Sequence, residues 1–101
     1  AEMIEASHAL AAIAASRERR RALVVVPSVI TMRAARRYLE DHGADMKYVR
    51  FVLPDTLHAV RGRGFSVVVV DSYARMQARD MGRSREFEAA VSAAARGGSR
   101  G

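Results

Sequence analysis

Apolar residues along the chain gather in short runs that are separated by segments with a helical spacing. Two runs are unbroken, at residues 23–26 and 67–70, and a third at residues 48–53 is interrupted only by Arg50. Runs of strand length that are rich in β-branched side chains are typical of parallel strands covered on both faces. The pattern predicts three parallel strands, with the valine run at 67–70 in the centre and the strand that carries Arg50 at an edge.

Helical spacing fills the segments around these strands. The first predicted helix covers residues 2–15, and its inner face carries Met3, Ala6, Leu10 and Ile13. Acidic residues in its first turn suit the positive end of the helix dipole. We therefore expect an amphipathic helix before the first strand.

Residues with capping side chains mark where the other helices begin. Ser28 or Thr31 caps the helix that follows the first strand, and Ser84 caps the last helix. After the second strand, Asp55 is expected to cap a short helical turn over residues 56–60. Helical segments therefore separate the predicted strands.

This alternation of strands and helices defines the expected fold class. Right-handed crossovers between parallel strands give an α/β fold, here a small three-layer sandwich with a short parallel sheet of about three strands and helices on both faces. Neither a repeat nor a linker divides the chain, so residues 1–101 form a single domain. Residues 97–101, Gly-Gly-Ser-Arg-Gly, are expected to be a flexible tail.

Charge balance and the absence of cysteine narrow the function classes. The 101 residues include 17 lysines and arginines against 11 acidic residues, a net charge of +6, and no cysteine. Arginine pairs with phosphate and stacks on bases, so the excess favours a nucleic acid or an acidic protein as partner; solubilising charge alone is the alternative. Without thiols or an apolar stretch of about 20 residues, we expect a cytoplasmic protein that does not enter membranes.

A dense run of charge follows the first predicted helix, Arg17-Glu18-Arg19-Arg20-Arg21. Cations are favourable at the C-terminus of a helix, so the run has a structural explanation as a solvated helix end. The alternative is a patch that contacts phosphate, which requires arginines that converge on one surface. The sequence leaves both interpretations open.

Polar residues that follow the predicted strands are the candidates for chemistry, namely Ser28, Asp55 and Asp71. The carboxyl ends of parallel strands share one edge, so we expect the three near one another, where they suit a magnesium ion bound through water. The alternatives are that Asp55 caps a helix and that Asp71 bonds the turn after its strand. The sequence has no glycine-rich phosphate loop, paired-histidine site or nucleophile elbow, so we predict no catalytic residue and no cofactor.

Three segments, in the same order along the chain, resemble the ATPase core of superfamily-two helicases and phage terminases. Residues 24–28, Val-Val-Val-Pro-Ser, look like the segment of those motors that touches a nucleic-acid backbone, and residues 53–57, Leu-Pro-Asp-Thr-Leu, look like the segment they use next. The stretch from Val67 to Met76 resembles their Walker B strand. The similarity covers about half of the chain.

This resemblance implies positions for several residues and also has two departures. Asp71 would contact a metal, and Ser28 and Thr56 would contact a nucleic-acid backbone. However, Ser72 stands where the motors have their catalytic glutamate, and the Walker A loop has no counterpart. What the resemblance implies is a degenerate fragment of the motor's ATPase core, kept for binding, in a small protein of the kind that bacteriophages encode.

We therefore expect a non-catalytic α/β module that engages nucleic acid or a host protein through a basic surface. The candidate nucleic-acid-binding residues, expected near the carboxyl edge of the sheet, are Ser28, Arg33, Thr56, Arg61, Arg63, Arg75 and Arg79. One alternative is a small magnesium-dependent nucleotide or phosphate hydrolase with Asp55 and Asp71 at the metal. Another is a homo-oligomeric protein that associates through its alanine-rich first and last helices.

Overall fold

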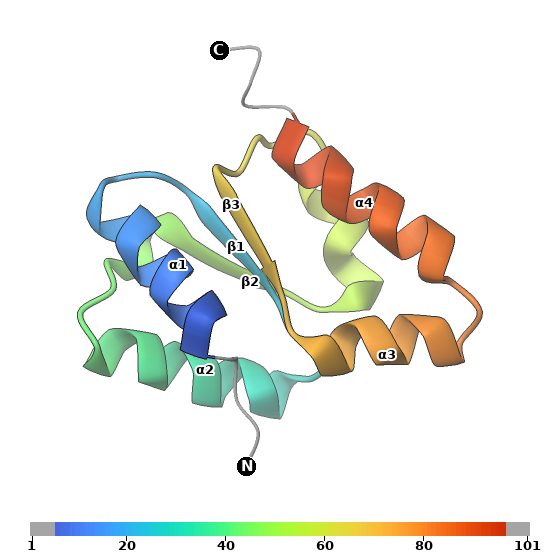
Figure 1. Ribbon diagram of the computed structural model, residues 1–101, viewed down its shortest axis with the longest axis horizontal. Helices are drawn as coiled ribbons and strands as arrows, with labels where there is room; N and C mark the ends of the chain where they lie inside the picture. Colours follow the sequence, from blue (N-terminus) through green and yellow to red (C-terminus); the bar gives the residue numbers. More distant parts are fainter. Residues whose placement is uncertain (1–5, 97–101) are drawn as a thin grey trace.

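The computed structural model describes residues 6–96, which form one sheet with helices around it (Figure 1). The predicted flexible tail and the first residues of the first predicted helix, Met3 included, lie outside the described residues. In chain order the elements are α1 (Ala6–Arg17), β1 (Ala22–Val25), α2 (Val29–Asp41), the 3-10 helix η1 (Met46–Tyr48), β2 (Val49–Val52), the 3-10 helix η2 (Pro54–Val60), β3 (Val67–Val70), α3 (Ser72–Asp80) and α4 (Ser84–Arg96).

The three strands are parallel and lie in the order β2-β1-β3. In the register of the sheet, Ala22 at the start of β1 lies opposite Val49 on one side and Val67 on the other. The predicted α/β fold with a short three-stranded parallel sheet is confirmed. The predicted edge position of the strand that carries Arg50 is confirmed as well, because β2 pairs only with β1 within residues 6–96.

β1, and not the valine run, is the central strand. All four residues of β1 are fully buried, whereas Val67 and Val68 at the start of β3 are only half-buried. The prediction for β3 was wrong because an edge strand whose two faces are covered by helices needs the same apolar run as a central strand. Here α1 covers one face of β3 and α4 covers the other (Figure 1).

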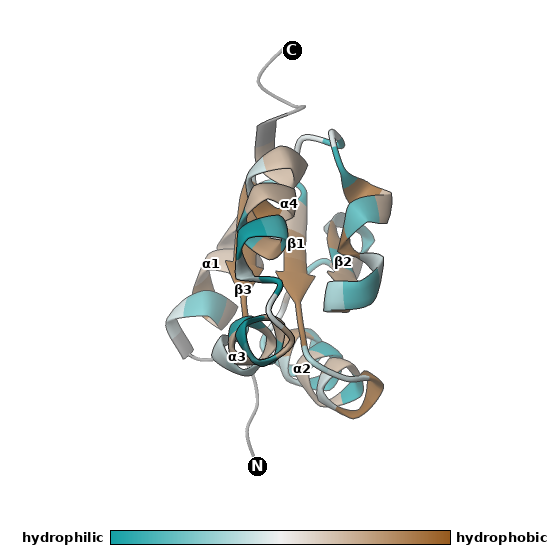
Figure 2. Ribbon diagram, turned by 90° about the vertical axis from the view of Figure 1, so that its right-hand side faces the viewer, coloured by the Kyte–Doolittle hydropathy of each residue, from teal (hydrophilic) through white to brown (hydrophobic). Residues whose placement is uncertain are grey.

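Alternate residues of β1 point to opposite faces of the sheet and build two separate cores. Val24 and Val26 pack with α1 and α2 on one face, whereas Leu23 and Val25 pack with η2, α3 and α4 on the other. Figure 2 shows the central strand β1 in hydrophobic brown, among helices in which hydrophilic and hydrophobic residues are mixed. Helices therefore cover both faces, as predicted.

The inner face of α1 differs from the predicted one. Ala9, Ala12 and Ile13 are buried, whereas Leu10 is 67% exposed. The small alanine side chains let this helix lie close to the sheet. Because the face with Ala9, Ala12 and Ile13 packs on the sheet, Leu10 points to solvent. The sequence misled here because alanine occurs all round the helix, so a single leucine appeared to mark the apolar face.

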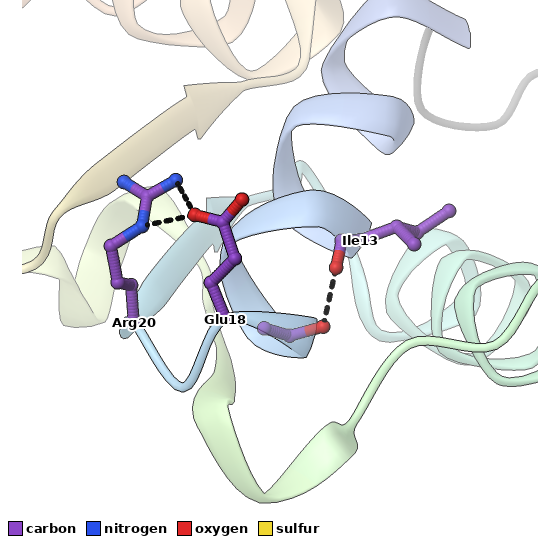
Figure 3. Close-up of polar contacts among 4 residues, drawn as sticks. Ile13, Glu18 and Arg20 are labelled. Carbon is purple, nitrogen blue, oxygen red and sulfur yellow. Dashed lines mark hydrogen bonds and ion pairs between the residues drawn. The ribbon is translucent and has the colours of Figure 1, made fainter.

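A buried serine joins the end of α1 to the loop after α2. The Ser16 hydroxyl donates to the Ile13 carbonyl at 2.8 Å (Figure 3). It also accepts the Asp45 amide at 3.0 Å. Both bonds satisfy a hydroxyl that is completely removed from solvent. They fix the position at which the chain leaves α1.

Ser28 is the N-cap of α2, one of the two predicted alternatives. Its hydroxyl accepts the Thr31 amide at 3.2 Å, so Thr31 lies within the first turn. Asp55 is not the cap of η2, because it is exposed inside the first turn of that helix. Thr56 instead accepts the Leu53 amide at 3.2 Å. The short turn after β2 is therefore real, but its predicted cap is wrong.

No helix within residues 6–96 combines the length and the apolar composition needed to cross a bilayer.

Candidate binding sites at the two ends of the sheet

The two connections that leave the carboxyl end of the sheet diverge between β1 and β3. After β1 the chain continues into α2, which packs in the core on one face, and after β3 it continues into α3, which packs in the core on the other face. In open parallel sheets such a divergence is where ligands bind. The Asp71 amide, directly after β3, donates to the Val25 carbonyl at the end of β1 at 2.9 Å. Ser28 follows β1, so Ser28 and Asp71 lie at the carboxyl ends of neighbouring strands.

Asp71 has a structural role at this end of the sheet. It is only 3% exposed, and its Oδ1 atom accepts the Tyr73 amide at 2.8 Å as the N-cap of α3. This is the alternative interpretation in which Asp71 bonds the turn after its strand. The second oxygen, Oδ2, is buried and has no hydrogen-bond partner within the described residues. One oxygen of the carboxylate therefore starts α3, and the other is not used by the described part of the chain.

Asp55 does not join Asp71, contrary to the expectation that both carboxylates lie close together. The two residues follow the two edge strands, with β1 between them. At about 4.8 Å per strand spacing, their backbones are separated by roughly 10 Å. Within residues 6–96, no group of three or more acidic, histidine or cysteine side chains could hold a metal ion. The predicted carboxylates do not converge.

The other candidates at the carboxyl end are in different environments. Arg33 is exposed on α2 and Arg79 is exposed on α3, with no ion pair for either within the described residues. Arg75 forms an ion pair with Glu88 of α4. The Thr56 hydroxyl is engaged with the backbone of Leu53.

Arg61 and Arg63 lie at the amino end of the sheet, opposite to their expected position. The crossover through η2 returns the chain to the start of β3, so the loop that carries both arginines precedes a strand and does not follow one. At this end the Ser66 amide donates to the Arg21 carbonyl at 2.9 Å, next to the start of β1. The prediction was wrong because it placed this loop at the carboxyl end of the sheet, whereas the loop completes the crossover and lies where the chain enters β3.

Two arginine-rich loops, about forty residues apart in the chain, meet at this amino end. The Arg21 guanidinium donates to the Arg63 carbonyl at 3.0 Å and lies 4.6 Å from the centre of the Phe65 ring. Arg20 pairs with Glu18, its Nη2 lying 2.8 Å from Oε1 (Figure 3). The five arginines of these loops, which we call the amino-end cluster, are Arg19, Arg20, Arg21, Arg61 and Arg63.

Backbone hydrogen bonds to the end of α4 hold the second loop in place. The Gly62 amide donates to the Ala93 carbonyl at 3.0 Å, and the Gly64 amide donates to the Ala94 carbonyl at 2.9 Å. Both glycines have positive φ angles, +76° and +72°, which side-chain-bearing residues rarely adopt. Arg61 and Arg63 therefore extend from an anchored loop.

The sequence did contain a signal for this convergence. Residues 17–21 and 61–66 both precede a strand, and the amino ends of parallel strands share one edge just as their carboxyl ends do. Applying that rule to both ends would have placed the two arginine-rich loops together. The structure joins the two loops at this end of the sheet through the Arg21 guanidinium and the Arg63 carbonyl.

Comparison of the chain with protein-family models, curated proteins and solved structures gave no match.

Proposed function

We propose that this chain is a non-catalytic α/β binding module that contacts the phosphate backbone of a nucleic acid through the amino-end cluster. The observation that carries the proposal is the convergence of two arginine-rich loops, joined by the hydrogen bond from Arg21 to the Arg63 carbonyl. Guanidinium groups match phosphate oxygens in geometry and keep their charge at every physiological pH. The cluster thus offers the electrostatic footprint of a backbone-binding surface.

Few acidic side chains offset this charge. Glu18 pairs with Arg20, and it is the one acidic residue within the two loops. Arg19, Arg61 and Arg63 are exposed, and within the described residues none of them forms an ion pair. Because backbone hydrogen bonds anchor the loop of Arg61 and Arg63, phosphate binding has to order only the side chains there, which favours affinity.

The backbone of Arg19 supports the same proposal. Its φ angle is +63°, in the left-handed region where glycine ordinarily ends a helix. Holding a side-chain-bearing residue there costs roughly 1–2 kcal/mol. At this position the Arg20 amide donates to the Ala15 carbonyl at 2.8 Å, so the left-handed residue ends α1 and leads the chain into the arginine-rich loop.

The two alternative functions have less support. A magnesium-dependent hydrolase needs convergent carboxylates, whereas Asp71 caps α3 and Asp55 follows the other edge strand. Association through the alanine-rich helices would have to use their outer faces, where Leu10, Ala11 and Ala14 of α1 are exposed, because Ala9, Ala12 and Ala94 are buried within the chain itself. A degenerate remnant of a helicase or terminase motor is compatible with the proposed module and remains part of the proposal.

Salt dependence tests the proposed function. Binding of labelled single- and double-stranded DNA and RNA is measured at about 50 and about 200 mM salt. Five phosphate contacts release enough counterions to lower the affinity for double-stranded DNA roughly 500-fold over this range. Binding that is absent at the lower salt concentration, or that is insensitive to salt, would contradict the proposal and would direct the search to a protein partner.

A further inference from the structure

A groove of about 460 Å³ lies where α1, α3 and α4 meet beside the carboxyl end of β3. Val70, the last residue of β3, lies within it, and α1 contributes His8 to its lining. Figure 1 shows α3 directly after the lower end of β3, with α1 and α4 on either side of this strand. The volume falls within the range of about 300–1,000 Å³ that small organic ligands occupy.

One stripe of α3 faces this groove. Its residues are three or four positions apart and therefore share one face of the helix. Along the helix they are Ser72, Arg75, Met76 and Arg79. The stripe presents two cations, one hydroxyl and one apolar side chain to the same space.

Glu88 of α4 orients the first of these cations. The Arg75 Nη2 atom donates to Glu88 Oε1 at 2.9 Å, and Nε donates to the other carboxylate oxygen. This fork engages one edge of the guanidinium and leaves both Nη1 protons for a ligand. The hydrogen bond to Glu88 also raises the pKa of Arg75, against a lowering by partial burial, so the cation stays charged.

The groove carries more positive than negative charge. Within residues 6–96, Arg79 has no ion pair, and Glu88 is the only acidic side chain that lines the groove. Ser84, the first residue of α4, adds a second hydroxyl opposite the stripe of α3. Two guanidinium groups about one helical turn apart, with a hydroxyl on either side, form a set of donors for an anion.

We propose that this groove binds a phosphate monoester with a small apolar body. A tetrahedral phosphate presents three oxygens in different directions, so it can accept from Arg75, Arg79 and a serine hydroxyl together, whereas a single guanidinium already satisfies a planar carboxylate. Val70 and Met76 give the apolar body a surface to contact. This site lies at the opposite end of the sheet from the amino-end cluster and does not depend on the proposed function.

Phenyl phosphate, which combines a phosphate monoester with an apolar ring, is the first probe. Titration calorimetry of the whole chain should give saturable binding with a Kd below about 1 mM. Inorganic phosphate should bind more weakly because it lacks the ring, and benzoate more weakly because it lacks the third oxygen. Equal affinity for benzoate, or no saturable binding of phenyl phosphate, would overturn the proposal.

Variants locate the site. Arg79→Gln should weaken phenyl phosphate binding about 10-fold or more, whereas Arg85→Gln, which removes an exposed cation of α4 outside the groove, should leave it unchanged. Glu88→Gln keeps one oxygen that accepts from Arg75 and removes the negative charge that competes with the ligand, so it should tighten phenyl phosphate binding, whereas Glu86→Gln two residues away should not. If Arg79→Gln and Arg85→Gln had equal effects, or if Glu88→Gln and Glu86→Gln did, binding would depend only on the net charge of the chain. Either result would overturn the proposal.

A competition experiment distinguishes the groove from the amino-end cluster. An oligonucleotide added at saturation should leave phenyl phosphate binding unchanged, because the two sites lie at opposite ends of the sheet. Displacement of phenyl phosphate by the oligonucleotide would show that the groove is part of the nucleic-acid-binding surface. That result would overturn the proposal that the groove is a separate site for small molecules.

Discussion

Replacing Arg61 and Arg63 together by serine is expected to weaken nucleic-acid binding roughly 200-fold at about 50 mM salt. Each phosphate contact contributes about 0.9 to the slope of log affinity against log salt, so the loss of two contacts should lower that slope by nearly 2. Both side chains are exposed, and the free energy of unfolding should change by less than about 0.5 kcal/mol. Fluorescence anisotropy with labelled oligonucleotides at several salt concentrations measures both quantities.

A matched variant controls for charge alone. Arg83→Ser with Arg85→Ser removes the same charge from exposed positions around the start of α4, away from the amino end of the sheet. This control should lose far less affinity and keep a slope near that of the unmodified chain. Equal losses in the two double variants would mean that the chain attracts nucleic acid only through its net charge, without a surface at the amino end.

Leu23→Ala is expected to lower the free energy of unfolding by about 2–5 kcal/mol. Leu23 lies on the central strand, is fully buried, and packs in the core formed with η2, α3 and α4. Truncation removes buried apolar surface and leaves a cavity between elements that the sheet holds apart. Because domains are stable by only about 5–15 kcal/mol, urea unfolding followed by circular dichroism should show a large shift of the midpoint.

Leu10→Ala is the matched control for this prediction. It removes the same side-chain atoms from α1, but Leu10 is 67% exposed. The expected change in the free energy of unfolding is below about 0.5 kcal/mol. A large loss at position 10 together with a small loss at position 23 would contradict the orientation of α1 and the central place of β1.

The parallel sheet with helices on both faces could be predicted because each strand is an unbroken or nearly unbroken apolar run. The order of the strands could not be predicted. An apolar run indicates that both faces of a strand are covered, but it does not indicate which strands pair with it on either side. Arg50 was the exception: a charged residue inside a strand needs solvent, and β2 is indeed at an edge. In α1 the abundance of alanine hid the buried face.

Sites were harder to predict than the fold, because a residue's position in the sequence fixes which end of the sheet it lies at but not its hydrogen bonds. Ser28 and Asp71 follow neighbouring strands at the same end of the sheet, and the side chains of both cap helices. Arg75 is engaged by Glu88, from a helix later in the chain, which no local pattern indicates. The amino-end cluster arises only once the crossover through η2 is in place.

Mapping where an oligonucleotide contacts the chain tests the central claim most directly. Heteronuclear NMR spectra of the backbone amides, recorded during titration with a short double-stranded DNA at low salt, report the contacted residues. We predict that the largest shifts occur in residues 17–22 and 61–66, at the amino end of the sheet. Shifts concentrated at residues 28–33 and 71–76 would place the contact at the carboxyl end and contradict the proposed interface.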